Sequence, residues 1–344
     1  MTSERTTSER TTSEPATSEP ATSEPTAAHR ARTSRHSGNE VEDLGTDYPG
    51  DAAHDGDLGQ IVVDGLVRLL DLERIEENIF RGVSPKSTWQ RVFGGQVAGQ
   101  ALVAAGRTVT PERHVHSLHS YFIRPGDPAV PIVYEVDRTR DGRSFSTRRV
   151  VAIQHGKPIF SLSASFQLEQ AGIDHQSEMP DAPAPETLPT LEERYADSPE
   201  AAAFYRMLPR PIDLRYVDDP PWQQHARGPR LGVNRVWMRA DGKLPDDPLL
   251  HVCAVTFASD MTLLDSVLVR HGLAPGIDPI SMASLDHAMW FQRPFRADEW
   301  MLYVSKSPTA SGSRGLATGR FFDRNGRHLV SVVQEGMIRV GQLD

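Results

Sequence analysis

The fold is decided by the stretch Asp247-Pro-Leu-Leu-His-Val-Cys-Ala-Val-Thr-Phe-Ala-Ser-Asp-Met-Thr-Leu-Leu-Asp-Ser-Val-Leu-Val-Arg-His-Gly272. It begins with an aspartate followed by proline and ends at a glycine, which are the start and stop signals of a helix. Between these signals, residues 248–271 are apolar on almost every side. Such a helix belongs inside a protein. We therefore predict one long helix that is buried by a curved antiparallel sheet.

Both halves of the chain follow the same order of predicted elements. In the second half, the helix precedes predicted strands at 282–292, 299–306, 313–323 and 328–339. In the first half, a helical segment over 95–109 precedes predicted strands at 115–123, 131–138, 144–153 and 158–167. Short turns such as Asn325-Gly326 separate the strands, which indicates antiparallel hairpins. Each half therefore predicts one helix followed by an antiparallel meander.

Three short motifs recur in the second half at a nearly constant distance from the first. They are Phe122-Ile-Arg-Pro125 with Phe291-Gln-Arg-Pro294, Arg143 and Thr147 with Arg314 and Thr318, and Gly156-Lys157 with Gly326-Arg327. The residue numbers within these pairs differ by 169, 171 and 170, and the order of the motifs is kept. An internal duplication explains this better than chance does. Two duplicated units could join their sheets edge to edge, which would remove exposed edge strands.

Residues 1–60 are predicted to be a disordered, low-complexity tail. Residues 2–26 are five copies of a five-residue unit, TSERT twice, TSEPA twice and TSEPT once, without any large apolar side chain. Such a segment cannot bury enough surface to offset its ordering entropy. Beyond the tail we predict an N-terminal unit at 61–175, a proline-rich linker at 176–208 and a C-terminal unit at 209–344.

Composition and charge exclude several classes of protein. The chain has 344 residues, one cysteine and a formal net charge of −9. The tail holds 12 acidic and 5 basic residues, so most of the net charge belongs to it and the rest of the chain is nearly neutral. We therefore expect no nucleic-acid partner. A single cysteine excludes a disulfide scaffold, and the lack of a long apolar run argues against a membrane span.

Asp260 lies in the middle of the apolar helical stretch, with no basic residue near it in the sequence. A buried carboxylate is unfavourable unless it is hydrogen-bonded, and such a group is a candidate for acid–base chemistry. Alternatively, Asp260 caps a helix end by accepting bonds from free backbone N–H groups, and the residues leave both interpretations open. Ser284 and Gln334, taken singly, resemble ordinary polar residues of strands. The neighbours Asp286 and His287 would point to opposite faces of a strand, which argues against a catalytic dyad.

Other motifs lack part of the chemistry that they would need. The glycines of Gly94–Gly99 have the spacing of a P-loop, but Gln100 and Ala101 stand where Lys and Ser/Thr are required. The helix N-terminus there still offers N–H donors to a carbonyl oxygen or an anion. The histidines of His114–His119 have no accompanying ligand cluster, so we expect no metal and no cofactor. Cys253 is predicted to be a core residue, and no GxSxG elbow is present.

Ordered sequence blocks spread over both halves are more specific than any single residue. In the first half they are Phe93-Gly-Gly-Gln-Val-Ala-Gly-Gln-Ala-Leu102, His116-Ser-Leu-His-Ser-Tyr-Phe-Ile-Arg-Pro-Gly-Asp127 and Gly156-Lys-Pro-Ile-Phe160. In the second half they are Ala258-Ser-Asp260, Leu285-Asp-His-Ala-Met-Trp-Phe291, Arg293-Pro-Phe295 and Val333-Gln-Glu-Gly336. Together they resemble acyl-CoA thioesterase II, the TesB-type double-hotdog family. The resemblance implies an α+β fold of two fused hotdog units, each an antiparallel sheet wrapped around a long helix.

The resemblance also implies a catalytic set in the second half. By motif, Asp260 matches the acidic residue of the family, Ser284 its Ser/Thr position and Gln334 its glutamine. A thioester has a good leaving group, because a thiol such as that of cysteine has a pKa of about 8.5. We therefore expect Asp260 to be the general base for a water held by Ser284 and Gln334, without a covalent intermediate. A backbone N–H at the N-terminus of a hotdog helix would polarise the thioester carbonyl.

The resemblance implies hydrolysis of medium- to long-chain fatty acyl-CoA to free fatty acid and coenzyme A. Arg148 and Arg314 are candidates for contacts with the coenzyme A phosphates. Two alternatives use the same fold. One is an acyl-CoA binding protein without turnover, and the other is a hotdog dehydratase, which would need an Asp/His or His/Glu pair in a helical motif.

Location and assembly are further expectations. The start of the sequence is polar and lacks a signal peptide, and its end, Gly341-Gln-Leu-Asp344, differs from a Ser-Lys-Leu peroxisomal signal. We therefore expect a cytoplasmic protein. Because hotdog proteins generally associate, the resemblance implies a homo-oligomer, either a dimer or a dimer of dimers.

Overall fold

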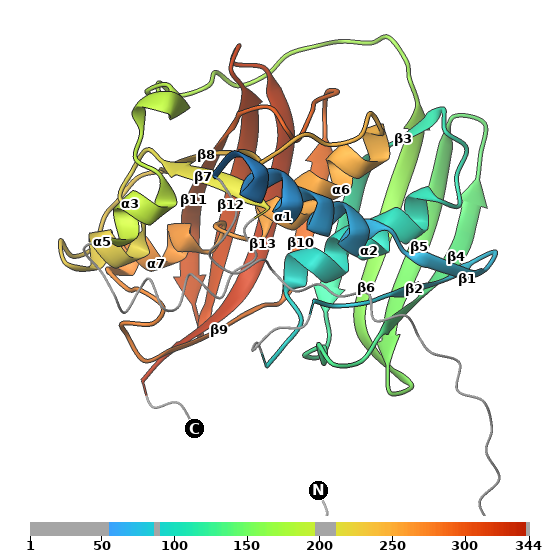
Figure 1. The fold of residues 1–344 in the computed structure, drawn as a ribbon, viewed down its shortest axis with the longest axis horizontal. Helices are drawn as coiled ribbons and strands as arrows, with labels where there is room; N and C mark the ends of the chain where they lie inside the picture. Colours follow the sequence, from blue (N-terminus) through green and yellow to red (C-terminus); the bar gives the residue numbers. More distant parts are fainter. Residues whose placement is uncertain (1–54, 86–89, 197–210, 342–344) are drawn as a thin grey trace, which may run out of the picture. The chain divides into compact units, whose positions relative to one another are not determined.

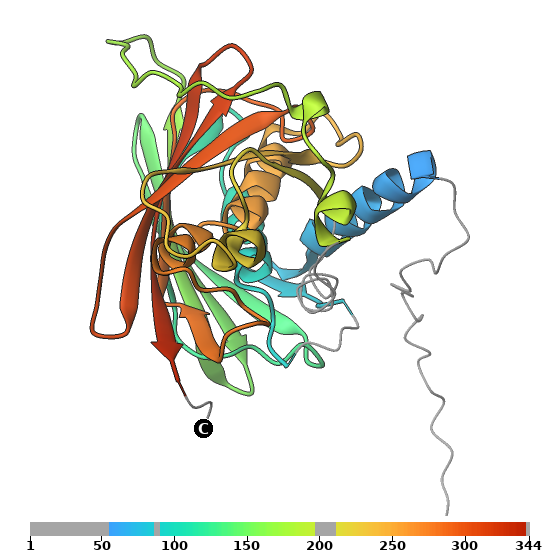
Figure 2. The same ribbon diagram turned by 90° about the vertical axis from the view of Figure 1, so that its left-hand side faces the viewer.

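Two helices, α2 (Gly94–Gly106) and α6 (Pro248–Ser259), lie together on one side of a large sheet (Figures 1 and 2). The computed structural model describes residues 55–85, 90–196 and 211–341. The helices are antiparallel, since Gly95 packs against Phe257 and Gly106 packs against Leu249. Apolar side chains of both helices belong to one hydrophobic core shared by the two halves.

The helices and strands of the two halves occur in a similar order. The first half contains α1 (Asp55–Leu70), β1 (Glu73–Glu76), β2 (Ile79–Gly82), α2, β3 (Arg113–Phe122), β4 (Ile132–Asp141), β5 (Phe145–Gln154) and β6 (Lys157–Leu168). Two short helices follow, the 3-10 helix η1 (Pro185–Thr187) and α3 (Leu191–Tyr195). The second half contains β7 (Ile212–Tyr216), α5 (Pro221–His225), β8 (Asn234–Ala240), α6, α7 (Asp265–His271), β9 (Ile280–Ser284), β10 (Asp286–Phe291), β11 (Met301–Ser311), β12 (Arg314–Asp323) and β13 (His328–Val340).

The strands form one antiparallel sheet that runs through both halves. Its order is β1-β2-β4-β5-β6-β3-β10-β13-β12-β11-β8-β7, and β9 pairs with β13 beside this path. The two half-sheets meet at β3 and β10, each of which would otherwise be an edge strand of its own half. The predicted edge-to-edge joining of the half-sheets is therefore confirmed, as is the antiparallel sheet around a helix in each half.

The register of the β3–β10 pair agrees with the internal duplication. His119 pairs with Ala288, and their residue numbers differ by 169, which is the offset of the Phe122 motif. In a pseudo-twofold pair, the residue on the axis meets its own counterpart. Tyr134 and Tyr303 show the same offset, and both are fully buried on equivalent strands, β4 and β11.

One of the three recurring motifs is not a structural match. Arg148 pairs with Ala164 in the first half, and Ala317 pairs with Gln334 in the second. In these registers, each residue of β5 has its counterpart in β12 169 positions later, the same offset as in the β3–β10 pair. The predicted match of Arg143 and Thr147 with residues 171 positions later is therefore wrong. The same registers identify Ala164 and Arg148 as the counterparts of Gln334 and Ala317.

The helix predicted over 248–271 is two helices, α6 and α7, separated by a turn at residues 260–264, so a helix does end at Asp260, as the capping interpretation of this residue allowed. The Ser259 hydroxyl bonds back to the Thr256 carbonyl, and the Asp260 side chain turns toward the first half. The contact of Asp260 with the first half is a tertiary one, and it holds the chain where α6 ends although apolar periodicity continues. Sequence reasoning also missed β7 and β8, which pair at the far edge of the second half-sheet.

The stretch between the halves covers the outer face of the second half-sheet. The Trp237 indole N–H donates to the Pro183 carbonyl at 2.9 Å, and Arg235 donates to the Asp181 carbonyl at 2.6 Å. Met179 and Leu188 pack on a second hydrophobic cluster that contains Trp237 and Trp300. Of the predicted linker at 176–208, residues 197–208 lie outside the described residues.

The predicted tail at 1–60 is described only at its end. Residues 1–54 lie outside the described residues, and α1 begins at Asp55, before the predicted start of the N-terminal unit at 61. Gln60 fixes this end of α1 to the second half, because its side chain donates to the Lys243 carbonyl at 3.0 Å and accepts from the Lys243 N–H at 2.7 Å.

The close approach of α2 and α6 depends on the missing side chain of Gly95. A Cβ atom there would lie 2.4 Å from the Phe257 carbonyl oxygen, which is backbone and cannot rotate away. We expect Gly95→Ala to lower the free energy of unfolding by about 1–3 kcal/mol, measured by urea denaturation. Gly65→Ala in α1 is the matched control, since the nearest atom to a Cβ there, in the Arg68 side chain, would be 3.9 Å away. It should be neutral or stabilising by up to about 1 kcal/mol, and equal effects of the two changes would contradict this explanation.

Candidate active site

Asp260, Ser284 and Gln334 come together although they are distant in the sequence. Gln334 Nε2 donates a hydrogen bond of 2.6 Å to Asp260 Oδ1. The Ser284 hydroxyl donates to the same oxygen over 3.3 Å. The structure thus joins all three residues that the sequence singled out, around one carboxylate oxygen.

Ser284 and Gln334 are positioned where β13 changes its partner strand. β13 pairs with β10 through Val333 and with β9 from Gly336 onward. Between β9 and β10, Leu285 donates to the Glu335 carbonyl and accepts from the Phe122 N–H of β3. This arrangement sets Ser284 at the end of β9, one strand away from the buried Gln334.

Asp260 is the residue at which α6 ends, and its carboxylate is bound by the first half of the chain. The Gly95 N–H in the first turn of α2 donates to it. Gly94 permits this contact, because a Cβ atom at that position would lie 2.7 Å from Asp260 Oδ2. Of the two interpretations left open above, Asp260 does accept a backbone N–H, but from α2 rather than from its own α7. The glycines before α2 were the signal for this contact.

The environment of Asp260 shifts its acidity. Burial raises the pKa of this carboxyl to about 6, and the hydrogen bonds from Gln334, Ser284 and Gly95 oppose that rise. Asp260 as a whole residue is half-buried, and its carboxyl is desolvated. Near neutral pH such a carboxylate is mostly ionised, and it is a stronger base than an ordinary aspartate.

Gln334 is fully buried and bonds through only one end of its amide. Its Nε2 donates to Asp260, and its Oε1 has no partner among the described residues. A buried amide oxygen without a partner is unfavourable unless it accepts a bond from water or a ligand. The free acceptor of Gln334 therefore lies beside the base.

Asp286 and His287 do not form a dyad, as their adjacent positions on a strand predicted. The Asp286 carboxylate accepts from the Glu335 N–H at 2.6 Å. The buried His287 bonds through Nε2 to the Ser259 hydroxyl at 2.8 Å, and burial lowers the pKa of His287 to about 4. His287 is therefore a neutral residue behind Asp260 and does not contact the carboxylate of Asp286.

The structure also tests the cysteine and histidine residues that the sequence analysis considered. Cys253 is a fully buried core residue, and burial raises the pKa of its thiol. His116 bonds to the Ser165 hydroxyl at 2.8 Å. Within the described residues, no group of three or more His, Cys, Asp or Glu side chains is arranged to hold a metal ion.

The expectation that Arg148 contacts coenzyme A phosphates is wrong. Its guanidinium is 2% exposed and bonds to Thr108, to Asp141 and to backbone carbonyls inside the first half. Burial of this kind could not be deduced from the sequence. Arg314 is half-exposed and pairs with Glu335 at 3.0 Å, so its role stays a prediction.

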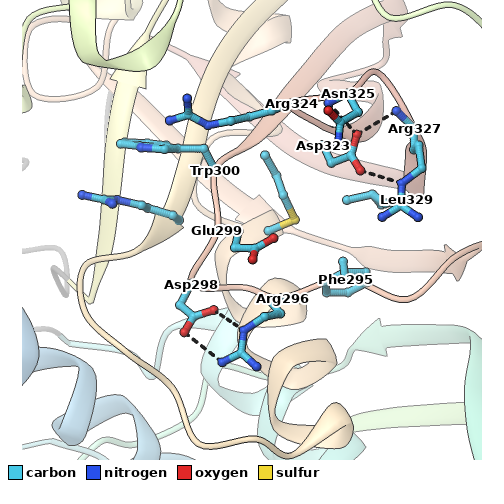
Figure 3. Close-up of a pocket in the computed structure, with 12 residues that line it drawn as sticks. Phe295, Arg296, Asp298, Glu299, Trp300, Asp323, Arg324, Asn325, Arg327 and Leu329 are labelled. Carbon is cyan, nitrogen blue, oxygen red and sulfur yellow. Dashed lines mark hydrogen bonds and ion pairs between the residues drawn. The ribbon is translucent and has the colours of Figure 1, made fainter.

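Figure 3 shows a cavity of the structure, which has a volume of about 470 Å³ and is lined by none of the three site residues. Its lining residues are Arg239, Phe295, Arg296, Asp298, Glu299, Trp300, Met301, Asp323, Arg324, Asn325, Arg327 and Leu329. Most charged groups there are already paired, as in the bonds of Arg296 to Asp298 and of Arg327 to Asp323. The chemistry is better sought at Asp260, where a desolvated carboxylate meets a free buried acceptor.

Comparison with known proteins decides the family. Two family models match, that of the acyl-CoA thioesterase N-terminal domain over residues 84–167 and that of acyl-CoA thioesterase over residues 210–337. A human protein named acyl-coenzyme A thioesterase 8 is 44% identical over 297 residues, which are 83% of this chain and 91% of that protein. The chain belongs to the acyl-CoA thioesterase family.

Solved structures agree with this family and with its fold. The crystal structure of an acyl-CoA thioesterase II, TesB2, from Mycobacterium marinum is 45% identical, with a TM-score of 0.67 over 80% of this chain and 99% of that chain. A hotdog-fold protein from Alicyclobacillus acidocaldarius is 19% identical, with a TM-score of 0.65 over 81% of this chain and 99% of that chain, and supports the fold alone. The predicted TesB-type family and double-hotdog fold are thereby confirmed. Among the described residues, no helix is long and apolar enough to cross a membrane.

The raised pKa of Asp260 predicts how stability depends on pH. The Asp260 carboxyl binds its proton more tightly in the folded state than in the unfolded state. Its ionisation therefore lowers the free energy of unfolding as pH rises from about 4 to about 6. Asp260→Asn removes this titration. We expect the variant to gain thermal stability relative to the original chain at pH 8, and to lose that advantage at pH 4. An identical difference in melting temperature at both pH values would contradict the shifted pKa.

Proposed function

We propose that this member of the acyl-CoA thioesterase family hydrolyses fatty acyl-CoA to free fatty acid and coenzyme A, with Asp260 as the general base. The observation that carries the proposal is the bond between the Asp260 carboxylate and the first turn of α2, completed by Gln334 at 2.6 Å. It joins a base of raised pKa to a helix N-terminus, where negative charge is stabilised.

Gln334 and Ser284 have two tasks in this proposal. Through Gln334 Nε2 and the Ser284 hydroxyl, they orient Asp260 Oδ1. Gln334 Oε1 accepts a hydrogen bond from the attacking water, and Asp260 takes up the other proton as that water adds to the carbonyl carbon. The water is thereby fixed between two acceptors, which supplies the orientation that a weak nucleophile needs.

The first turn of α2 supplies the electrophilic side of the reaction. Gly95 N–H is engaged by Asp260, and the neighbouring N–H groups of that turn have no acceptor within the helix. One of them stabilises the oxyanion that forms when the carbonyl π bond breaks. The tetrahedral intermediate then collapses with cleavage of the C–S bond, and the departing thiolate takes up the proton that Asp260 received.

Several finer features belong to the same proposal. We propose that the substrates are medium- to long-chain acyl groups, that no covalent acyl-enzyme forms, and that the protein is a cytoplasmic homo-oligomer, a dimer or a dimer of dimers. The division into a tail, two hotdog units and a linker at 176–208 is likewise a proposal. A dehydratase is disfavoured, because Asp286 and His287 bond to different partners.

Thiol release from a series of acyl-CoA chain lengths tests the activity. We expect release with the original chain and a fall in kcat of about 100-fold or more in Asp260→Asn, because amide nitrogen cannot accept the proton. Asp286→Asn is the matched control, since among the described residues its carboxylate accepts a bond from the Glu335 backbone N–H, and it should keep activity within about threefold.

Two results would contradict the proposal. Tight binding of acyl-CoA without thiol release at any chain length would favour the non-hydrolytic binding protein. Turnover retained in Asp260→Asn would show that another group is the base.

The pH dependence of kcat/KM provides a second test of the base. Only ionised Asp260 accepts the proton, so kcat/KM should fall about tenfold per pH unit below the pKa of about 6 and level off above it. Enzyme incubated at each pH and assayed at pH 7.5 controls for loss of folded protein. A profile that stays level down to pH 4.5, or that declines already below pH 8, would exclude this assignment.

A further inference from the structure

We infer that Tyr303 is a positioning residue for the reaction, because it fixes the main chain of Ser259, from which Asp260 extends. This inference rests on the proposed role of Asp260 as the base. It concerns a residue of β11 that does not contact the carboxylate through any bond described above, and that the sequence motifs did not single out.

Tyr303 bonds to the last carbonyl of α6. Its hydroxyl donates to the Ser259 carbonyl oxygen at 3.2 Å. Carbonyls in the last turn of a helix lack donor partners within the helix, so their direction depends on outside donors. Since Asp260 follows immediately, a change in the direction of this carbonyl rotates the peptide that joins Ser259 to Asp260.

The hydroxyl of Tyr303 is itself held in one place. The side chain is fully buried, and its ring stacks on Phe321 with centroids 4.0 Å apart and planes 10° apart. Gly319 on β12 leaves room for the ring, since a Cβ atom there would lie 2.4 Å from it. The position of the hydroxyl is therefore fixed by the second half-sheet.

The Ser259 side chain provides a second attachment. Its hydroxyl donates to the Thr256 carbonyl at 2.9 Å and accepts from Nε2 of the neutral His287 at 2.8 Å. Ser259 is thus attached to β11 through its carbonyl and to β10 through its side chain. With both attachments in place, the Asp260 carboxylate meets Gly95 of α2 and Gln334 of β13 at the same time.

The duplication supplies a matched control. Tyr134, the counterpart of Tyr303 in the first half, is also fully buried, but its hydroxyl donates to the side chain of Gln100 in the middle of α2, at 2.7 Å. Tyr134→Phe and Tyr303→Phe each remove one buried hydroxyl and leave one buried acceptor unpaired. They differ in whether that acceptor belongs to the end of α6 that carries Asp260.

The experiment compares steady-state kinetics of the two variants in the full chain. For Tyr303→Phe we expect kcat to fall about 10- to 100-fold with KM unchanged within about twofold, because a displaced base impairs the chemical step. The acid limb of the pH profile should move to higher pH, since the donors from Gln334, Ser284 and Gly95 that oppose the rise of the Asp260 pKa are weakened. Tyr134→Phe should leave kcat within about twofold and the limb in place.

Thermal unfolding separates this role from a purely structural one, because both variants should lower the melting temperature to a similar extent. A Tyr303→Phe enzyme with kcat within about twofold of the original chain would overturn the inference. Equal losses of kcat in both variants, with an unmoved acid limb, would overturn it too. Failure of the proposed function is distinguishable, since it would appear as absence of thiol release in the original chain.

Discussion

The contact between the Asp260 carboxylate and the first turn of α2 is the interaction on which the rest of the site depends. The carboxylate comes from the second half of the chain and its backbone donor, Gly95, from the first. Desolvation disfavours the charged form, and the helix N-terminus together with Gln334 offsets part of that effect. The balance leaves an ionisable base at the junction of the two halves. It also explains why α2 begins with two glycines, since side chains there would collide with Asp260 and with the Phe257 carbonyl.

The duplicated halves have diverged at this junction in a consistent way. Where the second half has Ala317 opposite Gln334, the first has Arg148 opposite Ala164. The guanidinium of Arg148 is buried against the Thr108 carbonyl and hydroxyl, just beyond the end of α2. One helix therefore has a carboxylate at its N-terminus and a guanidinium at its C-terminus, and both charges suit the helix dipole. The first half thus has a structural cation at the counterpart of Ala317, and it has Ala164, which has no amide, at the counterpart of Gln334.

The sequence predicted local features well and tertiary consequences poorly. Alternation of apolar residues and turn signals located the strands β3 to β6 and β11 to β13 to within a few residues, because those patterns are local. The single strand predicted at 282–292 is divided into β9 and β10 at Leu285. The helix over 248–271 was predicted too long, because the contacts that end it at Ser259 come from β11 and from α2. The strand β7 was missed, although Ile212-Asp-Leu-Arg-Tyr216 alternates as a half-buried strand should.

The site was predictable in part and for two different reasons. Asp260 stood out physically, as a carboxylate in an apolar stretch, whereas Ser284 and Gln334 gained weight only from the family resemblance. The structure then joined all three through hydrogen bonds. The burial of Arg148 and the support that Tyr303 gives to Ser259 depend on packing across strands, which no local pattern reveals.

The central claim is that water, activated by Asp260, attacks the thioester directly. A single turnover in H2 18O, with enzyme in excess over acyl-CoA, tests this claim by mass spectrometry of the fatty acid and of the peptide that contains Asp260. We expect the fatty acid to gain one 18O atom while the peptide gains none. Unlabelled fatty acid together with 18O in Asp260 would reveal a covalent acyl-aspartate and would contradict direct attack by water.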